Sequence, residues 1–311
     1  MKRKPRFKIM LLVMGYWLIV MGLNGCHNQR LYKDNRVLMG TFVEVASPDP
    51  RAADIVFAEI ERIEGLLSKY KADSEVAELN RLGSLKVSPD TFYIVKRAKE
   101  FYSLSDGAFD ISVAPLVDLW GFTDKKFAVP QDNKIKATLA LIGSDKIILN
   151  AGDNVIKFKL SGMKIDLGAI AKGYALDCAL KKLKDKSITS CLINAGGQVS
   201  CLGDKFGKPW RVAVQNPQGK GVIDYLELVN KSVSTSGDYR QFFSAGAKKY
   251  AHILDPKTGY PADSGIVAVT VVAEDGLTAD ALSTTVFVLG KLKGSALVKR
   301  VAGAKIKSIL P

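Results

Sequence analysis

Apolar residues recur at helical spacing in two segments of the first third of the chain. The first stripe consists of Ile55, Ile60, Ile63, Leu66, Leu67 and Tyr70. Asp49-Pro50 precedes this stripe and offers an N-cap followed by a first-turn proline. The second stripe follows Ser88-Pro89, ends near Gly107, and consists of Phe92, Val95, Ala98, Phe101 and Tyr102. This spacing predicts two amphipathic helices, each with one face toward a core.

Alternating and β-branched segments predict strands in the rest of the chain. The expected strands cover residues 37–46, 156–160, 190–194, 210–214, 225–229 and 266–272. Residues 166–183 are expected to form a loop that leads into a helix. Two further helices are expected at 277–289 and 295–301. Because strands and helices interleave without steady βαβ alternation, we expect an α+β fold with mostly antiparallel sheets packed with helices. No repeat with a period of about 20 to 50 residues is present, which excludes a solenoid or propeller.

The N-terminus has the order of a bacterial export signal. Five basic residues precede an apolar run at 9–23, which is short for a spanning helix. The run ends in Leu23-Asn24-Gly25-Cys26, which resembles a lipobox, where the cysteine is lipidated. We therefore expect a signal peptide at 1–25, a lipidated tether at 26–36 and one domain at 37–311. The alternative is an uncleaved transmembrane anchor, and either arrangement places the domain on the extracytoplasmic, periplasmic face.

Composition indicates a globular protein and argues against a nucleic-acid-binding one. The 311 residues are 47% hydrophobic and 24% charged, which is typical of a globular chain with a substantial core. The net charge of +14 includes a basic N-terminus, and the other lysines are scattered without aromatic platforms. A solvated basic surface is therefore favoured over nucleic-acid binding. With Cys26 lipidated, we expect Cys178, Cys191 and Cys201 to be small buried hydrophobes; one disulfide among them is the alternative.

Glycine-rich clusters mark places where backbone can approach a ligand closely. They lie at residues 39–41, 107–110, 166–173 and 194–197. In the cluster Asp166-Leu167-Gly168-Ala169-Ile170-Ala171-Lys172-Gly173, backbone N–H groups at the start of a helix and the charge of Lys172 suit a phosphate or pyrophosphate. Each cluster taken singly is also compatible with an ordinary turn. The Walker and Rossmann glycine patterns are absent, so a nucleotide would bind in another way.

Asp280 and Thr284 are four residues apart on a predicted helix and therefore share one face. Oxygen ligands of these two types suit Mg²⁺, which also takes phosphate oxygens. The alternative is structural: Asp280 would favour the first helical turn, and Thr284 would bond the carbonyl of its own helix.

His252 is the histidine available for acid–base work in a folded site, because the other histidine, His27, is adjacent to the lipidation site. His252 lies in a short segment that leads into a Pro/Gly turn at 255–261. Asp255 in that turn could orient an imidazole or simply start the turn. A buried structural histidine is the alternative interpretation of His252.

Together these motifs resemble those of the ApbE family. The similar segments are Met39-Gly40-Thr41, 68–70, Ser74-Glu75, 107–122, 166–177, 193–197, 252–261 and 279–290. They follow the family order and cover essentially all of the chain after residue 36. The chain departs from the common family pattern at Gln198 and at Ser283.

This resemblance implies a fold, a set of ligands and roles for individual residues. The fold would be an ApbE-like, T-fold-like α+β domain. The residues implied to contact FAD are Met39, Tyr70, Ala108, Phe109, Asp110, Asp166, Lys172 and Leu254. The implied Mg²⁺ ligands are Asp280, Thr284 and the backbone carbonyl of Ala169. His252 is then the expected catalytic base, and Asp255 is a lesser candidate.

The implied activity is that of an FAD:protein FMN transferase. A threonine or serine hydroxyl of an acceptor flavoprotein would attack the FMN-side phosphorus of FAD, and AMP would leave. The expected partners are FAD, flavoprotein subunits of exported redox complexes, and the membrane through the lipid anchor. The alternatives are a Mg²⁺-dependent FAD pyrophosphatase, which gives FMN and AMP, and a non-catalytic periplasmic FAD-binding lipoprotein.

Overall fold

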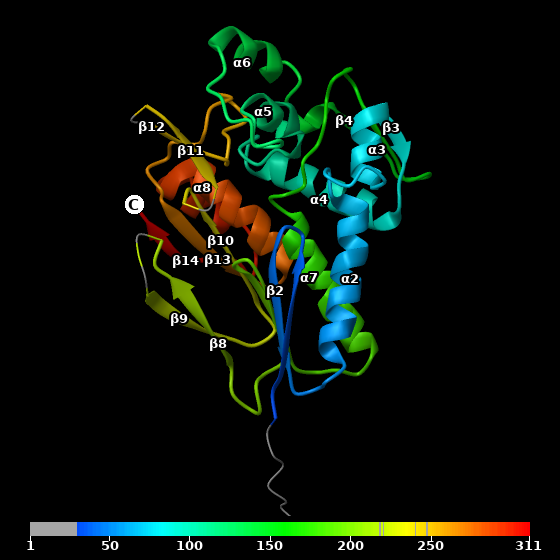
Figure 1. Ribbon diagram of the computed structural model, residues 1–311, viewed down its shortest axis with the longest axis vertical. Coiled ribbons are helices and arrows are strands. Elements are labelled where there is room, and N and C mark those ends of the chain that lie inside the picture. The colour runs from blue at the N-terminus through cyan, green and yellow to red at the C-terminus, as the bar shows by residue number, and fades with distance from the viewer. Residues whose placement is uncertain (1–29, 218, 220, 240, 247) are drawn as a thin grey trace, which may run out of the picture. The chain divides into compact units, whose positions relative to one another are not determined.

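An antiparallel sheet of seven strands organises the folded part of the chain, in the order β1-β2-β6-β7-β10-β13-β14 (Figure 1). The computed structural model describes residues 30–311 except 218, 220, 240 and 247. The strands of this sheet are β1 (Tyr32–Leu38), β2 (Thr41–Ser47), β6 (Cys191–Ala195), β7 (Gln198–Leu202), β10 (Ser232–Gly237), β13 (Ala268–Ala273) and β14 (Lys305–Leu310). Residues at 1–25 and Cys26 lie outside the described part, so the export signal and lipidation stay predictions.

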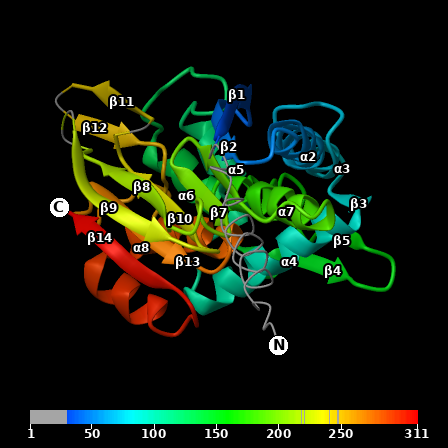
Figure 2. The ribbon, with the colours of Figure 1, turned by 90° about the horizontal axis from the view of Figure 1, so that it is seen from below.

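Three helices pack side by side on one face of this sheet (Figures 1 and 2). They are α2 (Ala52–Leu67), α7 (Ala171–Asp185) and α8 (Gly276–Val298). Helix α2 contacts β1 and β2, α7 contacts β6 and β7, and α8 contacts β10 and β13, while α7 also contacts α2 and α8. Their apolar stripes are buried against the sheet and against each other, as Val56, Ile60 and Ile63 of α2 illustrate. The main core therefore lies between the sheet and this helical layer.

Helix α8 contains the two expected C-terminal helical segments, and a break at Gly290 with φ of 78° separates them. By length and composition α8 could cross a membrane, but half of its apolar window is buried within the domain. Asp280 and Thr284 lie on α8 before the break. We therefore treat α8 as a core helix that carries site residues.

Further helices and small sheets cover the ends of this layered unit. The remaining helices are α3 (Glu75–Leu82), α4 (Pro89–Leu104), α5 (Ala114–Leu119) and α6 (Asp132–Leu139). The small sheets are β3 (Ser84–Lys86) with β5 (Val155–Phe158) and β4 (Ile147–Asn150), β8 (Trp210–Gln215) with β9 (Val222–Leu228), and β11 (Phe242–Ala245) with β12 (Lys248–Ala251). Trp120 fixes the 255–261 turn to α5 by donating from Nε1 to the Gly259 carbonyl at 2.9 Å. This turn follows the segment that carries His252.

The structure confirms the α+β class with antiparallel sheets, because every strand pair between the described elements is antiparallel. Three features differ from the sequence expectation. The segment 37–46, expected to be one strand, contains the turn at 39–40 that separates β1 from β2. The domain begins at Tyr32, within the segment expected to be tether, because Tyr32–Leu38 pairs with β2 in a hairpin. Tyr70 lies beyond the end of α2 and is 66% exposed, so it is not part of that helix's buried stripe.

The three cysteines in the described region are free thiols, as expected. Cys191 and Cys201 are buried, and Cys178 is partly buried. Burial raises the pKa of the Cys191 thiol to about 12, which keeps it protonated and unreactive at neutral pH.

Candidate active site

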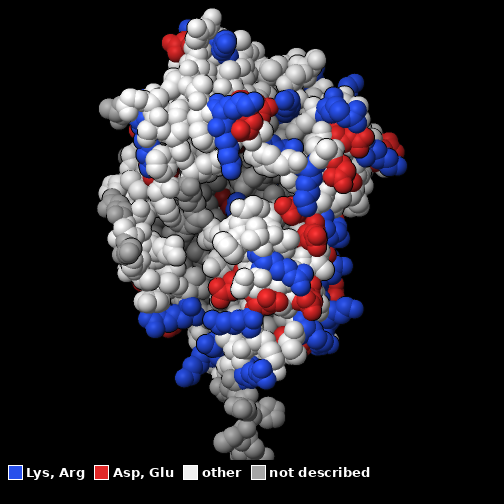
Figure 3. All heavy atoms as spheres, in the orientation of Figure 1, with Lys and Arg blue, Asp and Glu red and all other residues white. Residues whose placement is uncertain are grey.

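A pocket of about 330 Å³ opens beside the ends of α7 and α8, and Figure 3 shows a hollow on this face of the molecule. Its walls come from segments that are far apart in sequence, around residues 70, 108–122, 166–172, 196–198, 234–241, 252–256 and 280–288. Site residues expected from the sequence that line it are Tyr70, Ala108, Phe109, Asp110, Asp166, Ala169, Lys172, His252, Leu254, Asp280 and Thr284. The fold therefore brings most of the expected FAD, metal and catalytic residues together in one place.

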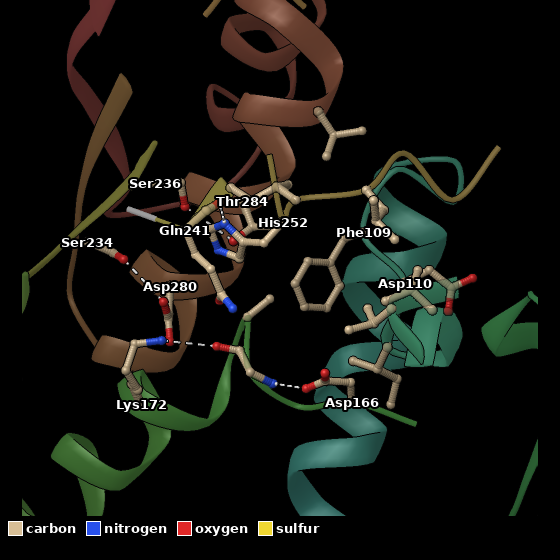
Figure 4. Close-up of a pocket in the computed structure, with 18 of the residues that line it drawn as sticks. Phe109, Asp110, Asp166, Lys172, Ser234, Ser236, Gln241, His252, Asp280 and Thr284 are labelled. Carbon is tan, nitrogen blue, oxygen red and sulfur yellow. Dashed lines mark hydrogen bonds between the residues drawn. The ribbon is translucent and has the colours of Figure 1, made fainter. Parts of the chain in front are cut away.

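Asp280 and Thr284 lie at the base of this pocket, one turn apart on α8 (Figure 4). Asp280 is 4% exposed, and its Oδ2 accepts a hydrogen bond from the Gly173 N–H at 3.0 Å. Its Oδ1 accepts from the Ser234 hydroxyl at 3.2 Å. Thr284 Oγ1 lies 3.3 Å from the Ser236 hydroxyl. These contacts hold both side chains against the end of β10, where they can act together.

The donor set at this end of the pocket fits a hard divalent cation. No lysine, arginine or histidine forms an ion pair with Asp280 in the described part of the chain, although a buried carboxylate is normally paired with a cation or a metal. Within residues 30–311, apart from the four undescribed ones, no group of three or more His, Cys, Asp or Glu could hold a metal. A site here must therefore combine one carboxylate with neutral oxygens, and Thr284 and the Ala169 segment offer these.

The loop before α7 is held in shape by hydrogen bonds and one ion pair. Asp166 Oδ1 accepts from the Gly168 N–H at 2.8 Å, and Lys172 Nζ donates to the Gly168 carbonyl at 3.0 Å. Lys69 Nζ lies 2.8 Å from Asp166 Oδ2, and its side chain is only 7% exposed. Burial is the largest single effect and opposes the charge on Lys69, but Asp166, Tyr70 and Asp118 together raise the pKa of Lys69 above its ordinary value. The loop is thus preorganised beside the first turn of α7, where N–H groups favour anions.

Asp110 stabilises the side of the pocket that lies opposite Asp280 (Figure 4). Its Oδ1 accepts from the Ser112 N–H at 2.8 Å and from the hydroxyls of Ser112 and Ser144 at 2.7 and 2.5 Å. Burial raises the pKa of the Asp110 carboxyl, and these hydrogen bonds partly offset that effect. The side chain therefore fixes the 110–112 and 143–144 segments to each other, while Ala108 and Phe109 line the cavity.

His252 lies on the pocket wall beside Gln241 and Thr284 (Figure 4). Its Nδ1 is 3.0 Å from the Gln241 carbonyl oxygen, which also accepts the His252 backbone N–H at 3.1 Å. Because a carbonyl only accepts, the ring proton must lie on Nδ1, so the neutral ring has its lone pair on Nε2. This tautomer is the one that a general base with Nε2 as the accepting atom requires.

Comparisons with known proteins agree with this geometry. The sequence model of the ApbE family matches residues 39–307. The chain belongs to the ApbE family. The FAD:protein FMN transferase of Klebsiella pneumoniae strain 342 is 35% identical, over 88% of this chain and 87% of the relative. That of Treponema pallidum strain Nichols is 32% identical, over 94% of this chain and 89% of the relative.

Two solved structures show that the fold is also that of the family. The ApbE protein from Thermotoga maritima superposes with a TM-score of 0.83 and 36% identity, covering 89% of this chain and 93% of that one. The flavin transferase ApbE from Vibrio cholerae gives 0.79 and 28%, covering 89% and 92%. The ApbE resemblance stated from the motifs is confirmed, and the chain is an enzyme of the transferase class.

Two residues expected at the ApbE site are not on the pocket wall. Asp255 accepts the Lys257 N–H at 2.9 Å, and its backbone bonds Gly259 and Tyr260, so it shapes the turn. Leu254 and Pro256 on either side do line the pocket. Met39 is at the tip of the β1–β2 hairpin with φ of 50° and packs partly against the main core. The catalytic role of Asp255 and the FAD contact of Met39 stay predictions.

Sequence reasoning missed several residues that shape this ApbE pocket. Ser234 and Ser236 of β10 line it and, through Ser283, join Asp280 to Thr284 by hydroxyl contacts of 3.3 Å or less. Their signal was the alternation in the 232–237 segment, in which every second residue is a serine facing α8. Lys69 carried no local signal, because its partner Asp166 is distant in sequence.

The carboxylate of Asp177 ties α7 to the start of α8. It accepts the Gly276 N–H at 2.6 Å and the Leu277 N–H at 2.8 Å, so it satisfies donors at the start of α8. The two helices touch so closely that a Cβ on Gly173 would lie 2.1 Å from the Gly276 carbonyl oxygen. Glycine is therefore required at this crossing, which carries Lys172 on one side and Asp280 on the other.

We expect Asp177 to make stability depend on pH. Burial raises its pKa from 3.8 to about 7, so between these values the folded protein keeps a proton that the unfolded chain has lost. Its contribution to stability is thus fully present below about pH 4 and is lost as the pH rises to about 7. Urea unfolding in EDTA should show the free-energy difference between wild type and Asp177→Asn falling over this range. A constant difference across the range would contradict the assignment.

Proposed function

We propose that this chain is an FAD:protein FMN transferase that requires Mg²⁺ and modifies a threonine or serine of an acceptor flavoprotein, releasing AMP. The observation that carries the proposal is a single pocket that brings Asp280, Thr284, Lys172 and His252 together. The names of the curated ApbE relatives support the same activity.

Each part of the pocket has a role in this reaction. Asp280, Thr284 and the Ala169 carbonyl would hold Mg²⁺, which when bound neutralises charge on the FAD phosphates. Lys172 and the positive end of the α7 helix dipole would orient the same phosphates. The N–H groups around Gly168 keep their direction because Asp166 and Lys172 fix the loop.

The transfer reaction forms one bond, breaks one bond and requires one acceptor for a proton. The acceptor hydroxyl oxygen forms a bond to the FMN-side phosphorus, and the bond from that phosphorus to the bridging oxygen breaks. AMP leaves with the bridging oxygen, and the hydroxyl proton passes to Nε2 of His252. The hydrogen bond from Nδ1 to the Gln241 carbonyl holds the ring in the orientation that this step needs.

The decisive experiment incubates the full chain with FAD, Mg²⁺ and membranes from its host lacking this gene. Transfer gives a protein band with covalent flavin fluorescence and a mass shift of one FMN, together with AMP. Free FMN and AMP without a modified protein would replace the proposal with FAD pyrophosphatase activity. Bound FAD that stays intact would indicate a non-catalytic flavin-binding protein.

We also propose that the enzyme works outside the cytoplasm, anchored by lipid on Cys26 and acting on subunits of exported redox complexes. The proposal rests on the basic and apolar N-terminal segments that end in Leu23-Asn24-Gly25-Cys26. We expect Cys26→Ser to leave the protein without lipid, as measured by mass spectrometry of the mature N-terminus. An unmodified Cys26 in wild type from the native host would refute this assignment.

A further inference from the structure

The β1–β2 hairpin carries an apolar patch on its outer face. Val37 and Phe42 lie directly opposite each other in the strand register, and they are 65% and 72% exposed. Among the large apolar side chains of the described residues, only Leu292 is more exposed than Phe42. We call Val37 and Phe42 the hairpin patch.

The two faces of the hairpin differ in what covers them. Val43 and Val45 point to the inner face, are buried, and pack in the core beneath α2. The hairpin patch points the other way, since side chains alternate along a strand. Single exposed apolar residues are common, but a cross-strand pair with no cover is typical of a surface that meets a partner.

The hairpin patch lies next to the mouth of the active-site pocket. Gly196, which lines the pocket, donates its N–H to the Phe42 carbonyl at 3.2 Å. Tyr70, which is 66% exposed, also lines the pocket. In Figure 3 the surface just below the hollow is mostly uncharged, and charged side chains gather farther from it. A protein whose hydroxyl enters the pocket must therefore pass over or beside this surface.

We propose that the hairpin patch is the docking surface for the acceptor protein and contacts apolar side chains close to the hydroxyl that receives FMN. The inference rests on the proposed function, since it names where that reaction's protein substrate binds. An apolar centre surrounded by polar groups is the usual composition of a protein interface. Here Lys33, Asn35 and Glu44 supply the polar rim on the same face, and Lys33 lies 3.7 Å from Glu44.

The position of the hairpin patch favours a protein partner over the lipid surface. The tether joins the domain at Tyr32, and β1 carries the chain about 17 Å from there to Val37. The face between these points is charged, because it contains Lys33 and Glu44. The apolar side chains are thus at the end of the strand that is nearest the pocket and farthest from Tyr32.

The test compares Val37→Ser/Phe42→Ser with the matched control Leu292→Ser, which removes a more exposed leucine from the far part of α8. Full-length proteins in detergent react with FAD, Mg²⁺ and detergent-solubilised membranes of the deletion strain. Covalent flavin on the acceptor band gives the transfer rate. FAD fluorescence quenching reports on the pocket, and thermal unfolding reports on the fold.

We expect the double variant to need about tenfold or more acceptor for half-maximal transfer. FAD affinity and the melting temperature should match those of Leu292→Ser. Transfer by the double variant within about twofold of the control would overturn the docking assignment and leave the proposed function intact. A defect seen with intact vesicles but absent in detergent would also overturn it, because a lipid surface would then be the partner. Absence of transfer by wild type would instead remove the proposed function.

Discussion

Asp280→Asn should abolish Mg²⁺-dependent turnover, with a loss of about 10³-fold or more at ordinary Mg²⁺ concentrations. Asparagine has nearly the same shape, so it can still accept the Gly173 N–H and can donate to Ser234. It removes only the negative charge that the cation needs. The measurement is the rate of AMP release from FAD as a function of Mg²⁺, with Asp280→Ala as the more severe change.

The control for this prediction is Asp275→Asn on the same helix. Asp275 caps α8 by accepting the Thr278 N–H at 2.7 Å, and it does not line the pocket. Its substitution should change stability slightly and leave the Mg²⁺ dependence as in wild type. Full turnover by Asp280→Asn would show that the metal binds elsewhere. An equal loss in both variants would point to a damaged helix rather than a lost ligand.

His252→Ala should keep the affinity for FAD and lower the rate of FMN transfer by about 10² to 10⁴, the usual contribution of a positioned general base. The wild-type rate should also fall in acid, because a protonated imidazole has no lone pair on Nε2. Transfer rates across pH, with FAD binding measured by fluorescence, test both expectations. In His252→Ala the transfer rate should be low at every pH and should no longer fall further in acid.

Asp255→Asn is the comparison for His252, because both residues were candidate bases in the same segment. The structure gives Asp255 a turn-forming role, so its substitution should change the rate only a few-fold. If His252→Ala transferred FMN within a few-fold of wild type while Asp255→Asn lost the acid limb, the assignments would be reversed.

Much of the pocket could be predicted because its parts are encoded locally. The 166–173 segment contains its own glycine turn, helix start and lysine, and Asp280 and Thr284 share a face by helical spacing alone. The start of α4 at Pro89 could also be predicted from nearby residues, because Ser88 caps the helix by accepting the Thr91 N–H. These features need no knowledge of the rest of the fold.

Other features depend on contacts that periodicity does not reveal. Strand β10 is buried although most of its residues are serine or threonine, because its hydroxyls bond to β7, β13 and α8. A polar buried strand gives no hydrophobic signal. Lys69 looks like a surface lysine in sequence, and only the fold brings it to Asp166. The early start of the domain at Tyr32 was missed because both faces of β1 are largely polar.

The close crossing at Gly173 and Gly276 limits how the proposed FAD phosphate site and the proposed Mg²⁺ site can move relative to each other. With Asp177 holding the start of α8, the phosphate loop and the carboxylate of Asp280 belong to one stiff unit with no room to slide. A movement of the loop that binds phosphate would therefore also displace Asp280. If Mg²⁺ changes the affinity for FAD, thermodynamic reciprocity requires that FAD changes the affinity for Mg²⁺ by the same factor.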